Sequence, residues 1–405
     1  MKPSNITKNS KCRICQSKDL VKFLDFGKLP LANGFLKDPG DKDEKYPLRV
    51  YFCKNCYLVQ LVDIVDKSHL FRNYIYFSSG MPKLSEHFKK YADDIIKRFL
   101  KPQDLVLEIG SNDGILLKHF EDKEFRVLGV DPAKNIPKQV KTIEDFFSEN
   151  LARKIAKKYG PAKAIMANNV VAHINDHHDL VRAVDALLAA DGIFVFEAPY
   201  LLDMLENLAY DTIYHEHLSY LSLLPLVKLF GQFGFYIFDA EIHPVHGQSI
   251  RVFVSRPGAY NISKSVEKYL DLERDLKFND INTYYKLAQQ IKTSQIKLAR
   301  LLKKIKSDAK SIAVYGASAR GNMILNSTKI NNRLISYAVD DLPSKQGTFT
   351  PGSHIPVISS LEARTKYPDY FLLLAWNYQP AILEKEQEFI KAGGKFILPL
   401  NSQII

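Results

Sequence analysis

The chain has four cysteines, and all of them lie near its start in two short pairs, Cys12-Arg-Ile-Cys15 and Cys53-Lys-Asn-Cys56. Two residues separate the members of each pair, so a tight turn can direct both sulfurs to one side, and two such pairs can surround one zinc ion. We predict a structural zinc, because a catalytic zinc keeps one coordination position open and here four thiolates fill all of them. Redox-active disulfides are the alternative, although no thioredoxin-like pattern adjoins either pair.

Length and charge set wider limits. The 405 residues exceed one ordinary domain, so we expect roughly two or three domains. Lys and Arg outnumber Asp and Glu by 56 to 45, and the formal charge of +11 favours a polyanion such as a nucleic acid, an acidic membrane surface or a phosphorylated small molecule. A lysine-rich composition without such a partner is the alternative. The N-terminus lacks a signal-peptide pattern, and no run reaches the ~20 apolar residues of a membrane span, so we expect a cytoplasmic protein.

A strand, a glycine loop and an acid follow one another in the middle of the chain. Leu105–Leu107 is typical of a short buried strand, and Gly110 and Gly114 then permit a tight turn before a helix. The next strand ends in Asp131, which can accept hydrogen bonds from a ribose diol. The loop lacks the glycines that admit a pyrophosphate, and Glu108 adjoins it. This favours S-adenosylmethionine, a cation with an amino-acid end, over a dinucleotide; a turn that serves only packing is the alternative.

The alternation of strands and helices continues beyond this loop. Residues 163–167 are typical of a third buried strand, and Asn168 and His173 follow at its carboxyl end, where open α/β sheets bind ligands. His177 and His178, which come next, are typical of a solvated loop. We therefore expect Asn168 and His173, and not this later pair, near a ligand.

A dense polar cluster lies in residues 210–220, which contain two histidines, a glutamate and three tyrosines. In an extended segment His215 and His217 would share one face and Glu216 would lie on the other. A metal site here lacks a third ligand at helical spacing, and a set of structural polar groups is the alternative. The cluster follows the strand over 193–198, so we place it near the functional edge of the sheet.

The last third of the chain predicts a second α/β unit. Residues 261–310 have a helical period and resemble bridging helices, and residues 311–321 then give a strand, a glycine loop and the start of a helix. Ser318 stands where a dinucleotide fingerprint has its second glycine, which disfavours NAD. A helix N-terminus favours a phosphate, and Arg320 and Lys345 add positive charge. A sheet that only packs against the rest of the protein is the alternative.

Taken together, these motifs resemble the sugar C-methyltransferases that act on nucleotide-linked 4-keto-deoxysugars, such as the 3-C-methyltransferases of antibiotic sugar biosynthesis. The resemblance covers nearly the whole chain and includes both cysteine pairs and residues 74–79, 107–114, 168–173, 214–217, 246–249, 315–321, 345–347, 351–352 and 375–378. Two positions depart from the pattern: Gln248 replaces a common glycine, and Arg320 stands where lysine is usual. Either departure can alter which sugar or nucleotide is accepted.

The resemblance implies an α/β protein with a class I, Rossmann-like methyltransferase domain, an N-terminal zinc-binding domain and a second, C-terminal Rossmann-like domain that helps to anchor the nucleotide sugar. We expect the zinc-binding domain over 1–70, the methyltransferase domain over 71–258, the bridging helices over 259–310 and the anchoring domain over 311–405. The implied reaction methylates C3 of a nucleoside-diphosphate-linked 4-keto-6-deoxysugar through an enolate. The nucleotide can be thymidine, guanosine or cytidine diphosphate.

The resemblance also implies the residues that do this work. His217 is the expected general base, and the same pocket is lined by Glu216, Tyr214, His173 and Tyr76, with Tyr74 as the alternative to Tyr76. The residues expected to bind S-adenosylmethionine are Ser78, Glu108, Gly110, Asn112, Asp113, Gly114, Asp131 and Asn168. Those expected to bind the nucleotide sugar are Tyr74, His246, Ser249, Arg251, Tyr315, Ser318, Arg320, Lys345, Trp376 and Asn377. The zinc ligands are Cys12, Cys15, Cys53 and Cys56.

Two rival functions remain beside this one. O- or N-methylation of a nucleotide sugar needs a base but no keto group. A zinc-containing nucleic-acid-binding module would use the positive charge, but the aromatic residues are not interleaved with Lys and Arg as in a stacking surface. We therefore expect a nucleotide-sugar substrate and neither a nucleic-acid nor a membrane partner.

Overall fold

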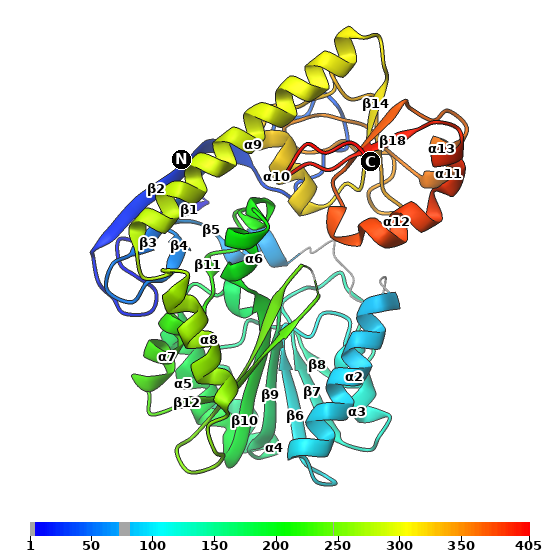
Figure 1. The fold of residues 1–405 in the computed structure, drawn as a ribbon. Coiled ribbons are helices and arrows are strands. Elements are labelled where there is room, and N and C mark those ends of the chain that lie inside the picture. The colour runs from blue at the N-terminus through cyan, green and yellow to red at the C-terminus, as the bar shows by residue number, and fades with distance from the viewer. Residues whose placement is uncertain (1–4, 73–81, 246) are drawn as a thin grey trace. The chain divides into compact units, whose positions relative to one another are not determined.

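The computed structural model describes residues 5–72, 82–245 and 247–405, and Figure 1 shows its elements. Four predicted site residues, Tyr74, Tyr76, Ser78 and His246, lie outside the described residues. The chain forms two compact units. The first consists of the residues up to Val21 with Tyr51–Leu202 and Leu218–Ile281, and the second of Lys22–Val50, Asp203–His217 and Asn282–Ile405. In the described part of the chain, no helix is long and apolar enough to cross a membrane.

The first unit contains a seven-stranded sheet in the order β12-β13-β10-β9-β6-β7-β8. Its strands are β6 (Leu105–Ile109), β7 (Arg126–Val130), β8 (Thr142–Ile143), β9 (Ala162–Asn168), β10 (Leu188–Pro199), β12 (Tyr236–His243) and β13 (Ser249–Ser255). Neighbouring strands from β10 to β8 are parallel, whereas β13 is antiparallel to both of its neighbours. The chain runs outward from β6 to β8 and then crosses to β9 on the other side of β6. Ligands bind at such a reversal, beyond the carboxyl ends of the strands.

Helices cover both faces of this sheet. On one face α2 (Pro82–Phe99) and α3 (Ile115–Glu121) pack onto the strands, as Figure 1 shows, and Val195 of β10 belongs to their apolar core. The alternate residues Phe194 and Phe196 contact Phe230 from the opposite face. Side chains alternate along a strand, so a strand buried on both faces is apolar throughout. The helices of that opposite face are α4 (Glu149–Tyr159), α5 (His177–Leu187) and α7 (Leu223–Gly231), and α8 (Lys264–Asp275) contacts α7 and β12.

The prediction of a solvated loop at His177 and His178 is wrong. Asp176 accepts a hydrogen bond from the backbone of Asp179 and caps α5, which begins at His177. His177 is fully buried and donates from Nε2 to the carbonyl of Val171 at 3.1 Å. Burial lowers the pKa of His177 to about 4, so this imidazole is neutral at physiological pH. The loop-like sequence hid a capped helix start, because Asp is a favoured cap residue.

Short strands surround the cysteine pairs. β1 (Ile6–Lys8) pairs with β5 (Asp63–Val65), and a four-stranded sheet has the order β11-β4-β3-β2. Its strands are β2 (Leu20–Pro30), β3 (Lys45–Cys53), β4 (Val59–Leu61) and β11 (Ser219–Tyr220), and the helix α1 (Lys67–Phe71) follows β5. β2 and most of β3 lie between the two cysteine pairs, so this segment is rich in β-structure.

The second unit contains a five-stranded parallel sheet in the order β16-β15-β14-β17-β18. Its strands are β14 (Ile312–Tyr315), β15 (Ala338–Val339), β16 (Val357–Ile358), β17 (Tyr370–Leu373) and β18 (Lys395–Ile397). The helices after β14 are α10 (Ala319–Ser327), α11 (Ser360–Arg364), α12 (Gln379–Lys385) and α13 (Gln387–Lys391), and α9 (Ile281–Ser307) precedes β14. The predicted second Rossmann-like sheet is confirmed, and so are helices between 261 and 310. The domain boundaries given above stay a prediction.

Candidate functional site

The four cysteine sulfurs of the first unit gather at one point. The Sγ atoms of Cys12 and Cys56 are 3.4 Å apart, those of Cys15 and Cys53 are 3.5 Å apart, and all four lie within 4.8 Å of one another. A disulfide would bring two sulfurs to ~2.05 Å, and all four cysteines are free. Four sulfurs at ~2.3 Å from a zinc ion in a tetrahedron would be roughly 3.8 Å apart, close to the separations here.

The protonation of this cluster also fits a cation. Hydrogen bonding to Cys53 raises the pKa of the Cys12 thiol to about 12, so the crowded sulfurs do not ionise together on their own. A divalent cation at their centre removes this obstacle, because thiolates bind zinc. Since all four positions are sulfur, the residues fit a closed structural zinc site.

Sequence reasoning missed Arg13, which lies between the first two cysteines and is 2% exposed. Its NH1 donates to Oε1 of Gln60 at 3.1 Å, and its Nε donates to Oδ1 of Asn175 at 3.1 Å. Nearby, Nε2 of His178 donates to the carbonyl of Ile14 at 2.6 Å. Arg13 and His178 therefore fasten the first cysteine turn to β4 and to the start of α5.

The glycine loop after β6 admits no side chain at its tightest points. Gly110 has a φ of +66°, and a Cβ built on it would lie 2.3 Å from Cγ2 of Val170. Gly114 has a φ of +88°, and its Cβ would lie 2.8 Å from Cγ2 of Val140. Both positions combine a left-handed backbone with a close approach, which glycine alone tolerates without strain.

Glu108 is the chemically unusual residue of this loop. Its side chain is buried, and Oε1 accepts a hydrogen bond from Nδ2 of Asn168 at 3.1 Å. Oε2 has no hydrogen-bond partner among the described residues, and neither has Oδ1 of Asn168. Burial raises the pKa of Glu108 from 4.5 to about 8, although the hydrogen bond from Asn168 opposes this rise. A buried acid with a free oxygen at a sheet's ligand edge fits a cationic ligand, as S-adenosylmethionine is.

Asp131, at the end of β7, is already engaged by the loop. Its two oxygens accept from the backbone N–H groups of Asn112 and Ala133, each at 2.9 Å. Nζ of Lys138, a residue that sequence reasoning missed, forms an ion pair with Asp131 at 3.0 Å. A carboxylate oxygen can accept more than one hydrogen bond, so capacity remains for a ribose diol. Asp113, the neighbour of Asn112, is likewise buried in this loop.

In the second unit, the segment around His217 is a turn and not an extended strand. The backbone N–H of His217 donates to the carbonyl of Tyr214 at 3.0 Å. The arrangement expected for an extended segment, with His215 and His217 on one face, therefore does not apply to this turn. Nε2 of His215 donates to the carbonyl of Tyr46 at 3.1 Å. The buried Glu216 accepts a hydrogen bond from Nδ2 of Asn33 at 2.7 Å.

The hydrogen bonds of His217 fix its tautomer. Nδ1 lies 2.7 Å from the carbonyl oxygen of Thr212, which can only accept, so Nδ1 carries the proton. In the neutral ring Nε2 then carries the lone pair, and the hydroxyl of Tyr214 donates to it at 2.9 Å. The side chain of His217 is only 8% exposed. This arrangement presents one oriented proton acceptor, which is what a general base requires.

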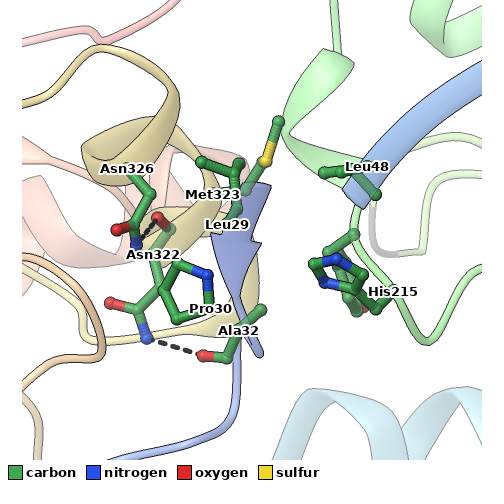
Figure 2. Close-up of a pocket in the computed structure, with 9 residues that line it drawn as sticks. Leu29, Pro30, Ala32, Leu48, His215, Asn322, Met323 and Asn326 are labelled. Carbon is green, nitrogen blue, oxygen red and sulfur yellow. Dashed lines mark hydrogen bonds between the residues drawn. The ribbon is translucent and has the colours of Figure 1, made fainter. Parts of the chain in front are cut away.

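A small cavity of the second unit lies beside this turn and has room for about one water molecule. Figure 2 shows that α10 contributes Asn322, Met323 and Asn326 to its wall. Asn322 donates from Nδ2 to the carbonyl of Ala32 at 2.8 Å, and its buried Oδ1 has no partner among the described residues. The size suits a water molecule and not a nucleotide sugar.

In the second unit, most of the residues predicted to bind the nucleotide already form hydrogen bonds or ion pairs with other protein groups. The hydroxyl of Tyr315 donates to Glu386 at 2.8 Å, and Ser318 caps α10 by accepting from Gly321 at 3.1 Å. Lys345 forms an ion pair with Asp340 at 3.0 Å. Two others, Arg320 and Trp376, both donate to Asp211, and the half-buried Asn377 follows Trp376.

The remaining predicted site residues lie in the first unit. Oγ of Ser249, at the start of β13, donates to the carbonyl of Val245 at 2.9 Å. Arg251 is buried and donates from Nε and NH2 to Glu197 at 2.8 and 2.6 Å. His87, His243 and Glu197 have ligand atoms within 4.8 Å of one another, but Arg251 already balances this carboxylate, so we assign no metal there. His173, after β9, meets the ring of Phe71 edge-on at 5.5 Å.

Family profiles and a known protein match most of the chain. Profiles of a zinc-binding domain, a methyltransferase domain and a C-methyltransferase C-terminal domain match residues 12–71, 84–239 and 244–401. The C-methyltransferase NovU of Streptomyces niveus is 36% identical over 398 residues, which cover 96% of this chain and 95% of that protein.

Solved structures match the chain over a smaller part. The magnesium protoporphyrin IX methyltransferase of Synechocystis PCC 6803, with bound SAH, has a TM-score of 0.34 and 14% identity, and covers 42% of this chain and 83% of that chain. An S-adenosylmethionine-dependent methyltransferase of Archaeoglobus fulgidus has a TM-score of 0.34 and 15% identity, and covers 42% of this chain and 94% of that chain.

Proposed function

The chain belongs to the S-adenosylmethionine-dependent C-methyltransferases and has their zinc-binding domain, and on this premise we propose that it methylates C3 of a nucleoside-diphosphate-linked 4-keto-6-deoxysugar. The segments that resemble the sugar C-methyltransferases, such as residues 214–217 and 315–321, support this substrate class. A carbon acceptor needs an acidic C–H bond, and the C4 carbonyl of such a sugar supplies one at C3. The observation that carries the proposal is the oriented imidazole of His217, with Nδ1 on Thr212 and the lone pair at Nε2.

His217 acts as the general base in this proposal. Its Nε2 takes the proton from C3, the C3–H bond breaks, and the electron pair moves to the C4 oxygen to give an enolate. The hydroxyl of Tyr214 hydrogen-bonds to Nε2 in the free protein, so it must turn away when substrate arrives. The proton leaves His217 for water after the methyl group has been transferred. A positioned base of this kind contributes about 10²–10⁴ in rate.

The enolate oxygen needs a donor, and His173 or Tyr76 is proposed for this role. Glu216, held by Asn33, and Tyr214 complete the pocket of the base.

Bound S-adenosylmethionine supplies an electrophilic methyl group. We propose that Glu108 and Asn168 hold the amino-acid end of S-adenosylmethionine and that Asp131 holds its ribose. Gly110 lets the loop approach the cofactor. Ser78, Asn112, Asp113 and Gly114 complete this proposed binding site.

The nucleotide part of the substrate is assigned to the second Rossmann-like unit. There the N-terminus of α10 at Ser318 presents backbone N–H groups, as helix starts do for phosphates. Lys345, Tyr315 and Asn377 complete the proposed anchor. Tyr74, His246, Ser249 and Arg251 stay predicted to bind the nucleotide sugar. A thermal-shift panel of TDP, GDP and CDP with S-adenosylhomocysteine identifies the nucleotide by the largest increase in Tm.

Proton exchange without methyl donor tests the proposal against O- or N-methylation. TDP-, GDP- and CDP-linked 4-keto-6-deoxyglucose are incubated with the protein in deuterated water, and NMR follows the two carbons beside the carbonyl, C3 and C5. We expect deuterium at C3, and about 10²–10⁴-fold slower exchange in His217→Asn. Exchange at C5 alone would reassign the methylated carbon, and no exchange with any of the three would contradict the enolate. His354→Asn, a half-exposed histidine paired with Asp43, is the matched control and should exchange normally.

A further inference from the structure

Asp211 is a fully buried carboxylate in the short helix η3 (Tyr210–Thr212), three residues before Tyr214. Arg320 of α10 donates to both of its oxygens, from Nε and from NH2, at 2.9 Å each. Trp376, in the short helix η4 (Trp376–Tyr378), donates from Nε1 to the same carboxylate at 2.7 Å. Three donors from two distant segments thus converge on one charge inside the second unit.

The helix η3 also carries the group that orients the proposed base. Thr212 follows Asp211 directly, and its carbonyl accepts the Nδ1 proton of His217 at 2.7 Å. The backbone N–H of Ile213 closes the turn on the carbonyl of Tyr210 at 2.9 Å. Because η3 is only three residues long, a movement of Asp211 also moves the Thr212 carbonyl. The contacts of Asp211 therefore govern where the ring of His217 is held.

The charge of Arg320 is already used in this arrangement. Its guanidinium makes a two-pronged contact with Asp211, and it lies 4.9 Å from the centre of the Trp376 ring. Planar two-pronged contacts of this kind suit arginine, and lysine cannot reproduce them. A phosphate would have to compete with a buried carboxylate for the same guanidinium. Arg320 is thus built to hold a protein group in place.

We propose that Asp211, Arg320 and Trp376 are positioning residues: they anchor η3 so that the Thr212 carbonyl keeps His217 in the tautomer with its lone pair on Nε2. This inference rests on the proposed function of His217 as a base. It replaces nucleotide binding as the role of Arg320 and Trp376, and it makes the second Rossmann-like unit a support for the base as well as an anchor for the nucleotide.

The test separates positioning from substrate binding. Asp211→Asn and Arg320→Gln are each assayed for proton exchange and for binding of the nucleoside diphosphate that stabilises the wild type most. We expect exchange to slow by about 10²-fold, the usual effect of a misplaced catalytic group, at unchanged affinity for the nucleotide. Arg320→Lys should fall between wild type and Arg320→Gln, because it keeps the charge and loses the two-pronged contact. Weaker nucleotide binding with unchanged exchange at saturation would overturn the proposal.

Two further measurements keep the test decisive. Asp211→Asn leaves a buried guanidinium without its partner and can fail to fold, so the double variant Asp211→Asn/Arg320→Gln, which removes both charges, is measured beside it. Nitrogen-15 NMR of histidine reports the tautomer of His217 without any turnover. We expect the Nδ1–H signal to be lost or mixed in the variants, and an unchanged signal would refute positioning. Wild type that exchanges no proton would contradict the proposed function instead, and the NMR signal still tests positioning.

Lys385→Gln is the matched control for these variants. Lys385 forms an exposed ion pair with Asp341 at 2.6 Å in the same unit. Exposed pairs contribute little to stability. This variant should therefore keep the wild-type exchange rate and the wild-type tautomer signal, and a loss in it would show that removing any charge of this unit disturbs His217.

Discussion

Replacing Glu108 by glutamine tests whether this buried acid is built for a cationic ligand. The folded protein raises the pKa of Glu108, mainly through burial, from 4.5 to about 8. The side chain therefore favours folding fully below pH 4.5, and this contribution is lost as the pH rises through 8. At 1.36 kcal/mol for each pH unit, the loss amounts to about 3–5 kcal/mol by pH 8.5.

Glu108→Gln carries no charge at any pH, so it escapes this loss. Without ligand, the Tm of the variant should gain on that of wild type between pH 5.5 and pH 8.5, by roughly 2–4 °C for each kcal/mol. Glu241→Gln is the matched control. Burial raises the pKa of Glu241, but His243, Arg251 and Arg98 outweigh burial and lower this pKa to about 2. Its Tm difference from wild type should stay flat over this range.

Ligand binding gives the second half of this test. A cation beside Oε2 favours the ionised form of Glu108, so S-adenosylmethionine should release a proton when it binds wild type near pH 7. Calorimetry in buffers of different ionisation enthalpy measures this proton, and Glu108→Gln should bind more weakly and release none. A Tm difference that does not change with pH, together with the same proton release in Glu108→Gln, would refute the assignment of Glu108.

Two other substitutions probe the cofactor loop and the metal centre. Gly110→Ala should weaken S-adenosylmethionine binding and destabilise the protein by about 1–3 kcal/mol, because its Cβ meets Val170. Gly234→Ala is the control for the backbone cost, because Gly234 has a φ of +72° and open space around its Cβ. Equal effects of the two variants in calorimetry and thermal unfolding would contradict the steric argument. Cys15→Ser should lower the zinc content from one ion per chain and reduce the Tm, as metal analysis and thermal unfolding will measure, and an unchanged zinc content would contradict the four-sulfur site.

Local patterns predicted the features that depend on neighbouring residues. The spacing of Cys12 and Cys15 fixes a turn, and the run from Leu105 to Asp131 fixes a strand, a loop and an acid, because each depends on a few consecutive dihedral angles. The buried His177 escaped prediction, since a helix cap and a polar loop begin with the same residue types. Patterns of this length do not encode burial.

Contacts between distant segments lay beyond such patterns. Nothing in the sequence pairs Asp211 with Arg320 or Trp376. The positive charge of Arg320 near a glycine loop predicted a phosphate ligand, whereas in the fold Arg320 and Trp376 donate to Asp211. The turn at His217 had a similar cause: alternation assumes an extended backbone, and the hydrogen bond to Tyr214 shows a tighter one. Candidate residues could be chosen from sequence, but their partners required the fold.

In the proposed reaction the methyl group goes to a ring carbon of a keto sugar. The most direct measurement incubates the nucleotide 4-keto-6-deoxyglucose that stabilises the protein most with S-adenosylmethionine labelled with carbon-13 in its methyl group, and locates the label by NMR. We expect a methyl group bonded to C3, with the C3 proton lost. A label on oxygen or nitrogen would contradict C-methylation.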